Sequence, residues 1–366
     1  MRFVIAMDSF KGSMTSLEAG NAAKRGILKS CPSSEVTAIP LADGGEGTVD
    51  AIAPFTGGIT RSVTVTGPLG NPVEASYVFV PGSETAYIEM AKAAGLTLIR
   101  EEKRNPLHAT TYGVGEIMKD AIANGAKSLV VCIGGSATND GGAGMLQALG
   151  AKLFDKDGND ISRGCTGLKD LASVDLSGII CRDVKITVAS DVTNPLCGPD
   201  GASFVYAPQK GATPAMCSEM DMLLKKFAEV SGFDPYEPGT GAAGGMSFAL
   251  KDFLGASVDS GADIVLKITG AEELIRNCDT VITGEGRMDS QTVNGKGPFK
   301  VMQLGRKYNK PVYGITGILG DGYEECLKAG FERIVPLVVP TMVREDAVKS
   351  MEETAAVLFA QPKMKI

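Results

Sequence analysis

The chain has 366 residues, of which 44% are hydrophobic and 22% charged, and its net charge at pH 7 is −7. This length allows a large core and suggests two domains. The acidic balance argues against nucleic acid or an anionic membrane surface as a partner. No apolar run reaches the ~18 residues of a membrane span, and Asp8 and Lys11 interrupt any secretion signal. We therefore expect a cytoplasmic protein without nucleic-acid or membrane partners.

The first 55 residues repeat one pattern twice, a buried strand followed by a polar loop and a helix. Thr15 or Ser16 could cap the first helix, and Glu18 lies in its first turn. This alternation is typical of parallel strands with crossover helices. The expected strands are residues 2–7 and 35–41, and the expected helices are residues 17–28 and 49–55.

The pattern changes near residue 60, where a domain boundary is plausible. Residues 61–66 and 74–80 alternate apolar and polar side chains around the segment 67–72, as an antiparallel hairpin does. Residues 198–211 are interpreted as a loop. Farther along we expect strands over 129–133 and 185–189 and helices over 110–124, 218–230 and 246–254.

The last part of the chain returns to the simple rhythm, with strands expected over 280–283, 312–316 and 333–339. Because this part resembles the first 55 residues more than the middle does, we predict an α/β protein in which the two ends form one discontinuous domain. The predicted domains are residues 1–62 with 276–366, and an inserted mixed α/β domain over residues 63–275.

A glycine-rich loop follows the expected strand at 129–133. Residues 134–142 carry almost no side-chain bulk, several hydroxyls and one carboxylate, and apolar residues then resume at Met145 with helical spacing. Such a loop between a strand and a helix N-terminus can hold phosphate, although tight turns also need glycine. Residues 239–245 form a second, denser glycine stretch.

Acidic residues follow five of the expected strands. Ligands of open parallel sheets bind at the carboxyl ends of the strands, so these acids could converge on one cleft. Any single one of them is better interpreted as a helix cap or turn residue. Carboxylates beside a phosphate loop favour Mg²⁺ and nucleotide over zinc. The acids are Asp8, Asp43 with Glu46, Asp140, Asp191, and Glu285 with Asp289, and the cations in loops of this kind are Lys11, Lys210, Arg287 and Lys296.

The residues that several other classes of enzyme require are absent from the sequence. His108 is the only histidine and no GxSxG is present, which disfavours Ser-His-Asp and Cys-His enzymes. No Walker GxxxxGK[ST] occurs, and no clean GxGxxG opens a helix after the first strand, so hydride transfer on a dinucleotide is disfavoured. The eight cysteines form no CxxC pair, and we interpret them as buried thiols.

Seven long motifs in order resemble the class I glycerate kinase family, from Met1 to about Pro340. The motifs are DSFKGS (8–13), PLADGGEGT (40–48), IGGSATNDGG (133–142), SDVTNPLCGP (190–199), PQKGA (208–212), GTGAAGG (239–245) and TGEGRMDSQT with GKGP (283–298). The resemblance implies transfer of phosphate from ATP, with Mg²⁺, to the 2-hydroxyl of D-glycerate. It also implies two α/β domains, one of them flavodoxin-like and discontinuous, with the active site in the cleft between them.

The chemistry of the residues in these motifs leads to a hypothesis for their roles. The cofactor-binding candidates are Gly134, Gly135, Ser136, Thr138, Asn139, Gly241, Gly244, Gly245 and Lys210. Lys11 and Arg287 would hold the carboxylate of glycerate and the moving phosphoryl group, and Asp191 or Asp43 would take the hydroxyl proton. Asp8, Glu285 and Asp289 form the pool for Mg²⁺. Alternatives are a kinase for another small hydroxy acid, 3-phosphorylation, or a nucleotide-dependent binding protein without turnover; a monomer or homodimer is expected.

Overall fold

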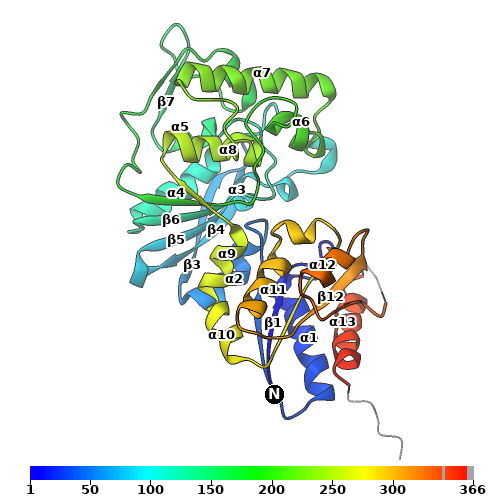
Figure 1. The fold of residues 1–366 in the computed structure, drawn as a ribbon. Helices are drawn as coiled ribbons and strands as arrows, with labels where there is room; N and C mark the ends of the chain where they lie inside the picture. The colour runs from blue at the N-terminus through cyan, green and yellow to red at the C-terminus, as the bar shows by residue number, and fades with distance from the viewer. Residues whose placement is uncertain (340–342, 361–366) are drawn as a thin grey trace, which may run out of the picture. The chain divides into compact units, whose positions relative to one another are not determined.

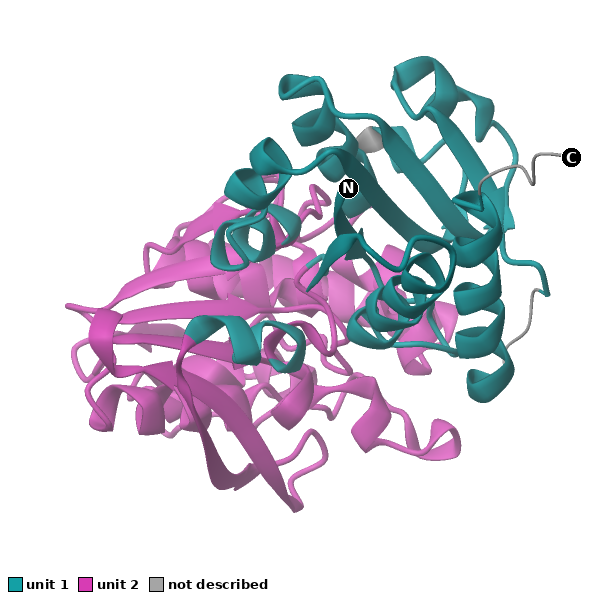
Figure 2. Ribbon diagram, turned by 90° about the horizontal axis from the view of Figure 1, so that it is seen from below, with its two compact units in different colours: residues 1–43, 50–56, 262–366 teal, residues 44–49, 57–261 magenta. Residues whose placement is uncertain are grey.

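The structure, a computed structural model, describes residues 1–339 and 343–360, apart from the side chain of Asn294. Figure 1 shows the elements in chain order, and Figure 2 colours the two compact units into which the contacts divide the chain. Unit 1 comprises residues 1–43, 50–56 and 262–366, and unit 2 comprises residues 44–49 and 57–261. Both units are therefore built from separate pieces of the sequence.

Unit 1 is organised around a parallel sheet in the order β13-β12-β11-β1-β2. The first strand lies between two partners, with Phe3 opposite Thr280 on one side and opposite Val36 on the other. The two ends of the chain thus share one sheet, as the sequence pattern predicted. The strands are β1 (Arg2–Met7), β2 (Glu35–Pro40), β11 (Thr280–Met288), β12 (Val312–Leu319) and β13 (Arg333–Pro336).

Helices cover both faces of this sheet, because strand residues alternate between two apolar clusters. Val4 packs into one cluster, and its neighbours Phe3 and Ile5 pack into the other. The predicted cap is confirmed, since the Glu18 amide donates to Thr15 Oγ1 at 3.2 Å. The helices with residues in unit 1 are α1 (Ser16–Ser30), α2 (Thr48–Thr56), α9 (Gly261–Ile268), α10 (Ala271–Asn277), η7 (Thr292–Asn294), α11 (Gly297–Lys307), α12 (Glu324–Ala329) and α13 (Arg344–Leu358).

Unit 2 contains a mixed sheet in the order β10-β9-β6-β5-β4-β3. The strands β3, β4 and β5 are antiparallel, which confirms the predicted hairpin, whereas β5, β6, β9 and β10 are parallel. A small antiparallel pair, β7 with β8, lies outside this sheet. The strands are β3 (Ile59–Thr66), β4 (Pro72–Val80), β5 (Thr85–Glu89), β6 (Ser128–Cys132), β7 (Lys152–Phe154), β8 (Ser173–Asp175), β9 (Lys185–Ala189) and β10 (Ser257–Asp259).

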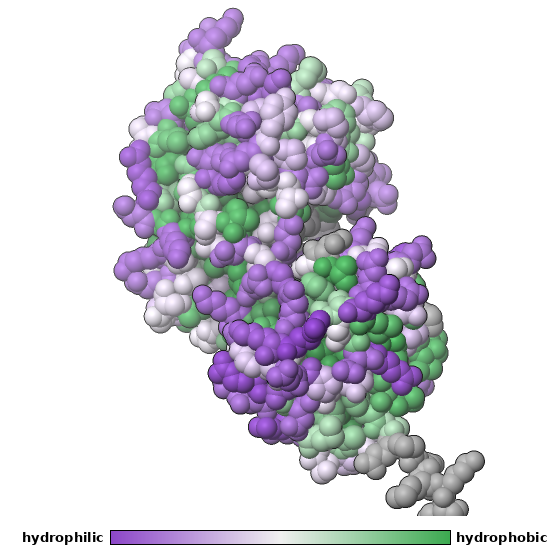
Figure 3. Space-filling model, in the orientation of Figure 1, coloured by the Kyte–Doolittle hydropathy of each residue, from purple (hydrophilic) through white to green (hydrophobic). Residues whose placement is uncertain are grey.

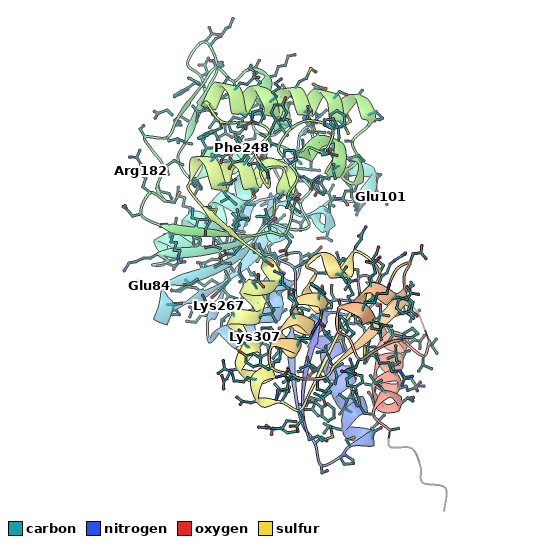
Figure 4. All side chains as sticks on the ribbon, in the orientation of Figure 1. Glu84, Glu101, Arg182, Phe248, Lys267 and Lys307 are labelled. Atoms are coloured by element: carbon teal, nitrogen blue, oxygen red, sulfur yellow. The ribbon has the colours of Figure 1, made fainter. Side chains whose placement is uncertain are left out.

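The core of unit 2 includes an aromatic cluster around Phe248, which is labelled in Figure 4. Its ring meets that of Phe227 edge to face at 5.5 Å, an arrangement that aromatic pairs favour. The helices are η1 (Pro81–Ser83), α3 (Ala91–Ala94), η2 (Leu96–Leu98), η3 (Glu101–Lys103), α4 (Tyr112–Ala123), α5 (Ala143–Ala148), η4 (Cys165–Lys169), α6 (Ala202–Tyr206), η5 (Pro208–Lys210), α7 (Pro214–Ser231), α8 (Ala242–Phe248) and η6 (Ala249–Phe253).

Three expectations were wrong. The strand expected over 333–339 ends at Pro336. Residues 198–211, interpreted as a loop, contain α6 and η5, because buried packing of Ala202 and Ser203 overrides the glycines and proline nearby. The strand expected to end at residue 283 continues to Met288, paired with β12 throughout. Its glycine at 284 is needed for close strand contact, since a Cβ there would lie 1.9 Å from the carbonyl oxygen of Ile315.

The distribution of polar residues on the surface and the state of the cysteines are as expected from the amino-acid composition. On the face drawn in Figure 3, hydrophilic residues are interspersed with apolar ones in each unit. Among residues 1–339 and 343–360, we find no helix with the length and apolar character that crossing a membrane requires. All eight cysteines are unpaired, and every one except the half-buried Cys31 is buried, as predicted.

Candidate active site

The acids of unit 1 gather at the carboxyl end of its sheet. Asp8 follows β1, and its amide donates to the carbonyl of Gly284 on β11 at 2.8 Å. Burial, with the negative charges of Asp43 and Glu285, raises the pKa of Asp8 from its ordinary value of 3.8 to about 7. The exposed cation of Lys11 acts in the opposite direction. These residues, from two loops and from β11, are thus electrostatic neighbours.

A second group of charges lies along the end of β11 and the segment after it. Glu285 accepts a hydrogen bond from Thr292 Oγ1 at 2.7 Å, and its pKa is raised by burial. Lys296 Nζ lies 3.6 Å from Glu285 Oε2 and 3.9 Å from Asp289 Oδ1, so one cation serves both carboxylates. The exposed guanidinium of Arg287 pairs with Asp289 at 3.2 Å.

The donors of Asp8, Glu285 and Asp289 suit Mg²⁺ chemically, since all are carboxylate oxygens. A bound divalent cation would also stabilise the charged form of Asp8, which its surroundings now disfavour. Within the described ranges, no three acidic, histidine or cysteine side chains are arranged to hold a metal ion. Mg²⁺ usually takes one or two carboxylates and completes its shell with water and substrate phosphates. Their role as metal ligands stays a prediction.

The raised pKa of Asp8 predicts a pH effect on stability. Between pH 3.8 and about pH 7 the unfolded chain has released this proton and the folded chain retains it. Stability therefore falls as the pH rises through this window, by at most about 1.4 kcal/mol per pH unit from this group. We expect Asp8→Asn to abolish that slope and to be more stable than the unmodified protein at pH 8, as measured by urea unfolding without metal. If Asp8→Asn and the unmodified protein had the same free energy of unfolding as each other at both pH 5 and pH 8, the raised pKa of Asp8 would be contradicted.

The glycine-rich loop after β6 in unit 2 is held from inside by a buried carboxylate. Asp140 Oδ2 accepts from the amide and hydroxyl of Thr111 at 2.8 and 2.9 Å and from the amide of Gly144 at 3.3 Å, while Oδ1 accepts from the amide of Gly142 at 3.1 Å. Asp140 thus fixes the start of α5 and joins it to α4. Asp140 therefore has the structural role of a helix cap or turn residue, as expected from the sequence for any single acid.

Lys210 is the buried cation of this loop, with 2% of its surface exposed. Its Nζ donates to Ser136 Oγ and to the carbonyl of Thr138, both at 2.7 Å. Burial lowers its pKa to about 7, against the attraction of Asp140. The structure therefore brings a cation from η5 into the loop that the sequence predicted to hold phosphate.

The second glycine stretch packs directly on the first. A Cβ on Gly244 would lie 2.0 Å from the carbonyl oxygen of Thr138, and one on Gly241 would lie 2.0 Å from that of Pro195. Gly244 also accepts a hydrogen bond from the amide of Gly141 at 3.0 Å. Residues 243–245 all have left-handed φ values, Ala243 among them at 56°. The two motifs predicted to bind the cofactor therefore pack against each other within unit 2.

Buried polar atoms without partners lie on the first loop and just after the second. They are Thr138 Oγ1 and Asn139 Oδ1 on the first loop and Ser247 Oγ on α8, all on side chains that are fully buried in the described structure. An unsatisfied buried hydroxyl or amide costs about 1–3 kcal/mol, and native proteins leave few of them. Three of the eight such atoms in the described residues lie here, and a polar ligand could supply the missing bonds.

Glu89, the last residue of β5, was not among the residues predicted from the sequence. Its carboxylate is fully buried and accepts from the amides of Gly47 at 2.8 Å and Val49 at 3.2 Å. It thereby holds the second half of the PLADGGEGT motif in unit 2, where Gly134 donates to the carbonyl of Gly44 at 3.1 Å. The available signal was a carboxylate at the end of an otherwise apolar strand.

The remaining site candidates lie near strand ends. Asp191 follows β9 and is exposed, while Gly44 approaches β9 so closely that a Cβ would lie 2.7 Å from the carbonyl oxygen of Ala189. Gly135, with φ at 77°, accepts a hydrogen bond from the amide of Leu96 at 2.9 Å. Asp43 lies in unit 1 and is exposed.

Comparisons with known proteins agree over nearly the whole chain. A sequence profile described as the glycerate kinase family matches residues 3–361. A glycerate 2-kinase of Escherichia coli K12 is 46% identical over 95% of this chain and 93% of its own length. A glycerate kinase of Bacillus subtilis 168 is 44% identical over 100% of this chain and 98% of its own. A crystal structure of a candidate glycerate kinase 2 from Salmonella typhimurium LT2 matches with a TM-score of 0.85 and 42% identity, covering 98% of this chain and 97% of that one.

Proposed function

Because the chain belongs to the glycerate kinase family, we propose that it transfers the γ-phosphoryl group of ATP to the 2-hydroxyl of D-glycerate, giving 2-phosphoglycerate and ADP. In this reaction the glycerate oxygen forms a bond to phosphorus, the bond from phosphorus to the β–γ bridging oxygen breaks, and the hydroxyl proton passes to a carboxylate. The proposal includes a cytoplasmic enzyme, monomeric or homodimeric, with no nucleic-acid or membrane partner.

One observation carries the nucleotide part of this proposal: a buried lysine donates to two points of a glycine-rich loop that also holds unsatisfied polar atoms. Phosphate oxygens would accept from the loop amides and from the ammonium group of Lys210. Their negative charge would raise the depressed pKa of that lysine and keep it protonated. Gly134, Gly135, Ser136, Thr138 and Asn139 on the first loop and Gly241, Gly244 and Gly245 on the second would form this cradle.

The proposed roles on the acceptor side are supported by charge and position. Lys11 and Arg287 are exposed cations beside acids at the end of the unit 1 sheet, where they would bind the glycerate carboxylate and the moving phosphoryl group. Asp191 or Asp43 would accept the hydroxyl proton. Asp8, Glu285 and Asp289 would hold Mg²⁺, which neutralises charge on the phosphates when it is bound.

We expect the purified protein, given ATP, MgCl₂ and D-glycerate, to release ADP and to form 2-phosphoglycerate, as identified by ³¹P and ¹³C NMR. Formation of 3-phosphoglycerate would correct the position of transfer and leave the substrate unchanged. A panel of other small hydroxy acids tests the substrate, and faster turnover of one of them would reassign it. Absence of ADP release with every acceptor would indicate a binding protein and would contradict the proposed function.

A further inference from the structure

Unit 2 contains a pocket of about 310 Å³ that none of the roles above uses. One wall is the turn between β3 and β4, with Pro68 and Leu69, and the other is the segment from η2 to η3, with Leu98 and Ile99. Glu101, the first residue of η3, is labelled in Figure 4 and marks this segment. The volume lies at the lower end of small-molecule sites, about 300–1,000 Å³, and exceeds what a three-carbon acid fills.

Both walls are built as fixed structure. In the turn, the amide of Gly67 donates to the carbonyl of Asn71 at 2.7 Å, and Gly70, with φ at 90°, donates back to Gly67 at 3.0 Å. In the other wall, Ile99 is buried, whereas Leu98 keeps 41% of its surface exposed. The pocket therefore presents apolar side chains of which Leu98 is partly exposed.

Hydrogen bonds connect both walls to the glycine-rich loop. From the second wall, Leu96 donates to the carbonyl of Gly135 at 2.9 Å. From the first, the carbonyl of Pro68 accepts from the amide of Thr110 at 2.9 Å, and the next residue, Thr111, is held by Asp140 of the loop at 2.8 Å. In the second wall, only Thr97 separates Leu98 from Leu96, and in the first wall Pro68 itself bonds to the residue that precedes Thr111.

The chemistry of the lining selects a flat, largely apolar group attached to an anion. Leucine and proline side chains offer surfaces on which an aromatic heterocycle packs. Arg100 and Lys103 bring two exposed cations to the pocket, and neither has an ion-pair partner among the residues that the structure describes. A guanidinium group stacks readily on an aromatic face.

We propose that this pocket receives the nucleoside part of the nucleotide whose phosphates lie on the glycine-rich loop. This inference rests on the proposed function and adds to it the location of the base and ribose. The proposal gives the turn at residues 67–71 a role in binding, whereas the sequence predicted it only as the connection of a hairpin.

Two ligands separate the nucleoside from the phosphates: ADP, and inorganic tripolyphosphate, which has no nucleoside. Leu98→Trp fills the pocket, and Leu98→Ser removes its apolar wall; both changes are at a partly exposed side chain. In titration calorimetry, we expect Leu98→Trp to raise the Kd of ADP at least tenfold and Leu98→Ser at least fivefold. The Kd of tripolyphosphate should stay within twofold of the value for the unmodified protein. Leu327→Trp, at a comparably exposed leucine of unit 1, is the matched control and leaves both values unchanged.

Unchanged ADP affinity in both Leu98 variants overturns the proposal, as does an equal loss of affinity for ADP and tripolyphosphate. Thermal unfolding of each variant identifies a folding defect, and in that case the Ser variant decides the result. Failure to phosphorylate D-glycerate would contradict the proposed function alone, because the binding measurements with ADP need no acceptor.

Discussion

Replacing Lys210 with methionine is expected to lower kcat/KM for ATP by about 100-fold or more, the scale seen when one preorganised donor to a developing charge is removed. The ammonium group joins Ser136 to the backbone of Thr138 from within a fully buried position, so its loss removes a positive charge and also two anchors of the loop. Steady-state kinetics with ATP varied at saturating D-glycerate measures the effect.

The matched control is Lys156→Met, at an exposed lysine of the same unit, for which activity should be unchanged. Lys210→Arg keeps the charge but puts a larger, planar guanidinium where a compact ammonium group is buried, and it should recover little activity. A Lys210→Met protein that melts at the normal temperature and turns over ATP at the normal rate would restrict this lysine to a dispensable structural role.

Asp191→Asn is expected to lower kcat by about 10²- to 10⁴-fold with a modest change in KM, because a general base acts mainly in the transition state. The amide keeps the size of the side chain and cannot accept the hydroxyl proton. Asp183→Asn, at another exposed aspartate of unit 2, serves as the control and should leave turnover unchanged.

The same measurement on Asp43→Asn distinguishes the two candidate bases. Turnover near normal in Asp191→Asn, with a large loss in Asp43→Asn, would transfer the role to Asp43. If both variants lose much of their turnover, the pH dependence of kcat must be measured as well. The fall of kcat at acidic pH reports the pKa of the base, so only replacement of the base changes that part of the profile.

Local patterns were sufficient to predict much of the fold. The strand at residues 2–7 and the Thr15 cap follow from alternation and capping chemistry that lie within a few residues of sequence. The predicted strand at 280–283 was shorter than β11 because Gly284 and Gly286 indicate a turn when only the local sequence is considered. In the structure both glycines lie within the strand, where Gly284 allows close packing. A single sequence gives no information on which neighbour approaches a glycine.

The contacts within the candidate site were harder to predict, for the same reason. The bond from Lys210 to Ser136 joins residues 74 positions apart, and the sequence placed both in candidate loops without pairing them. Glu89 was missed because its partners are backbone amides 40 or more residues away, and its position at the end of an apolar strand does not identify them. The acids predicted to bind Mg²⁺ and to accept the proton stay predictions.

The position of β1 between β2 and β11 constrains the order in which the chain can fold as the ribosome makes it. The edge that β1 offers to residue 280 stays unpaired until about three quarters of the chain has been synthesised. Unit 2, whose residues are complete by position 261, can form during that interval. Late closure of a long loop is slow, and the waiting strand is exposed to wrong partners, so we expect unit 1 to limit the folding yield.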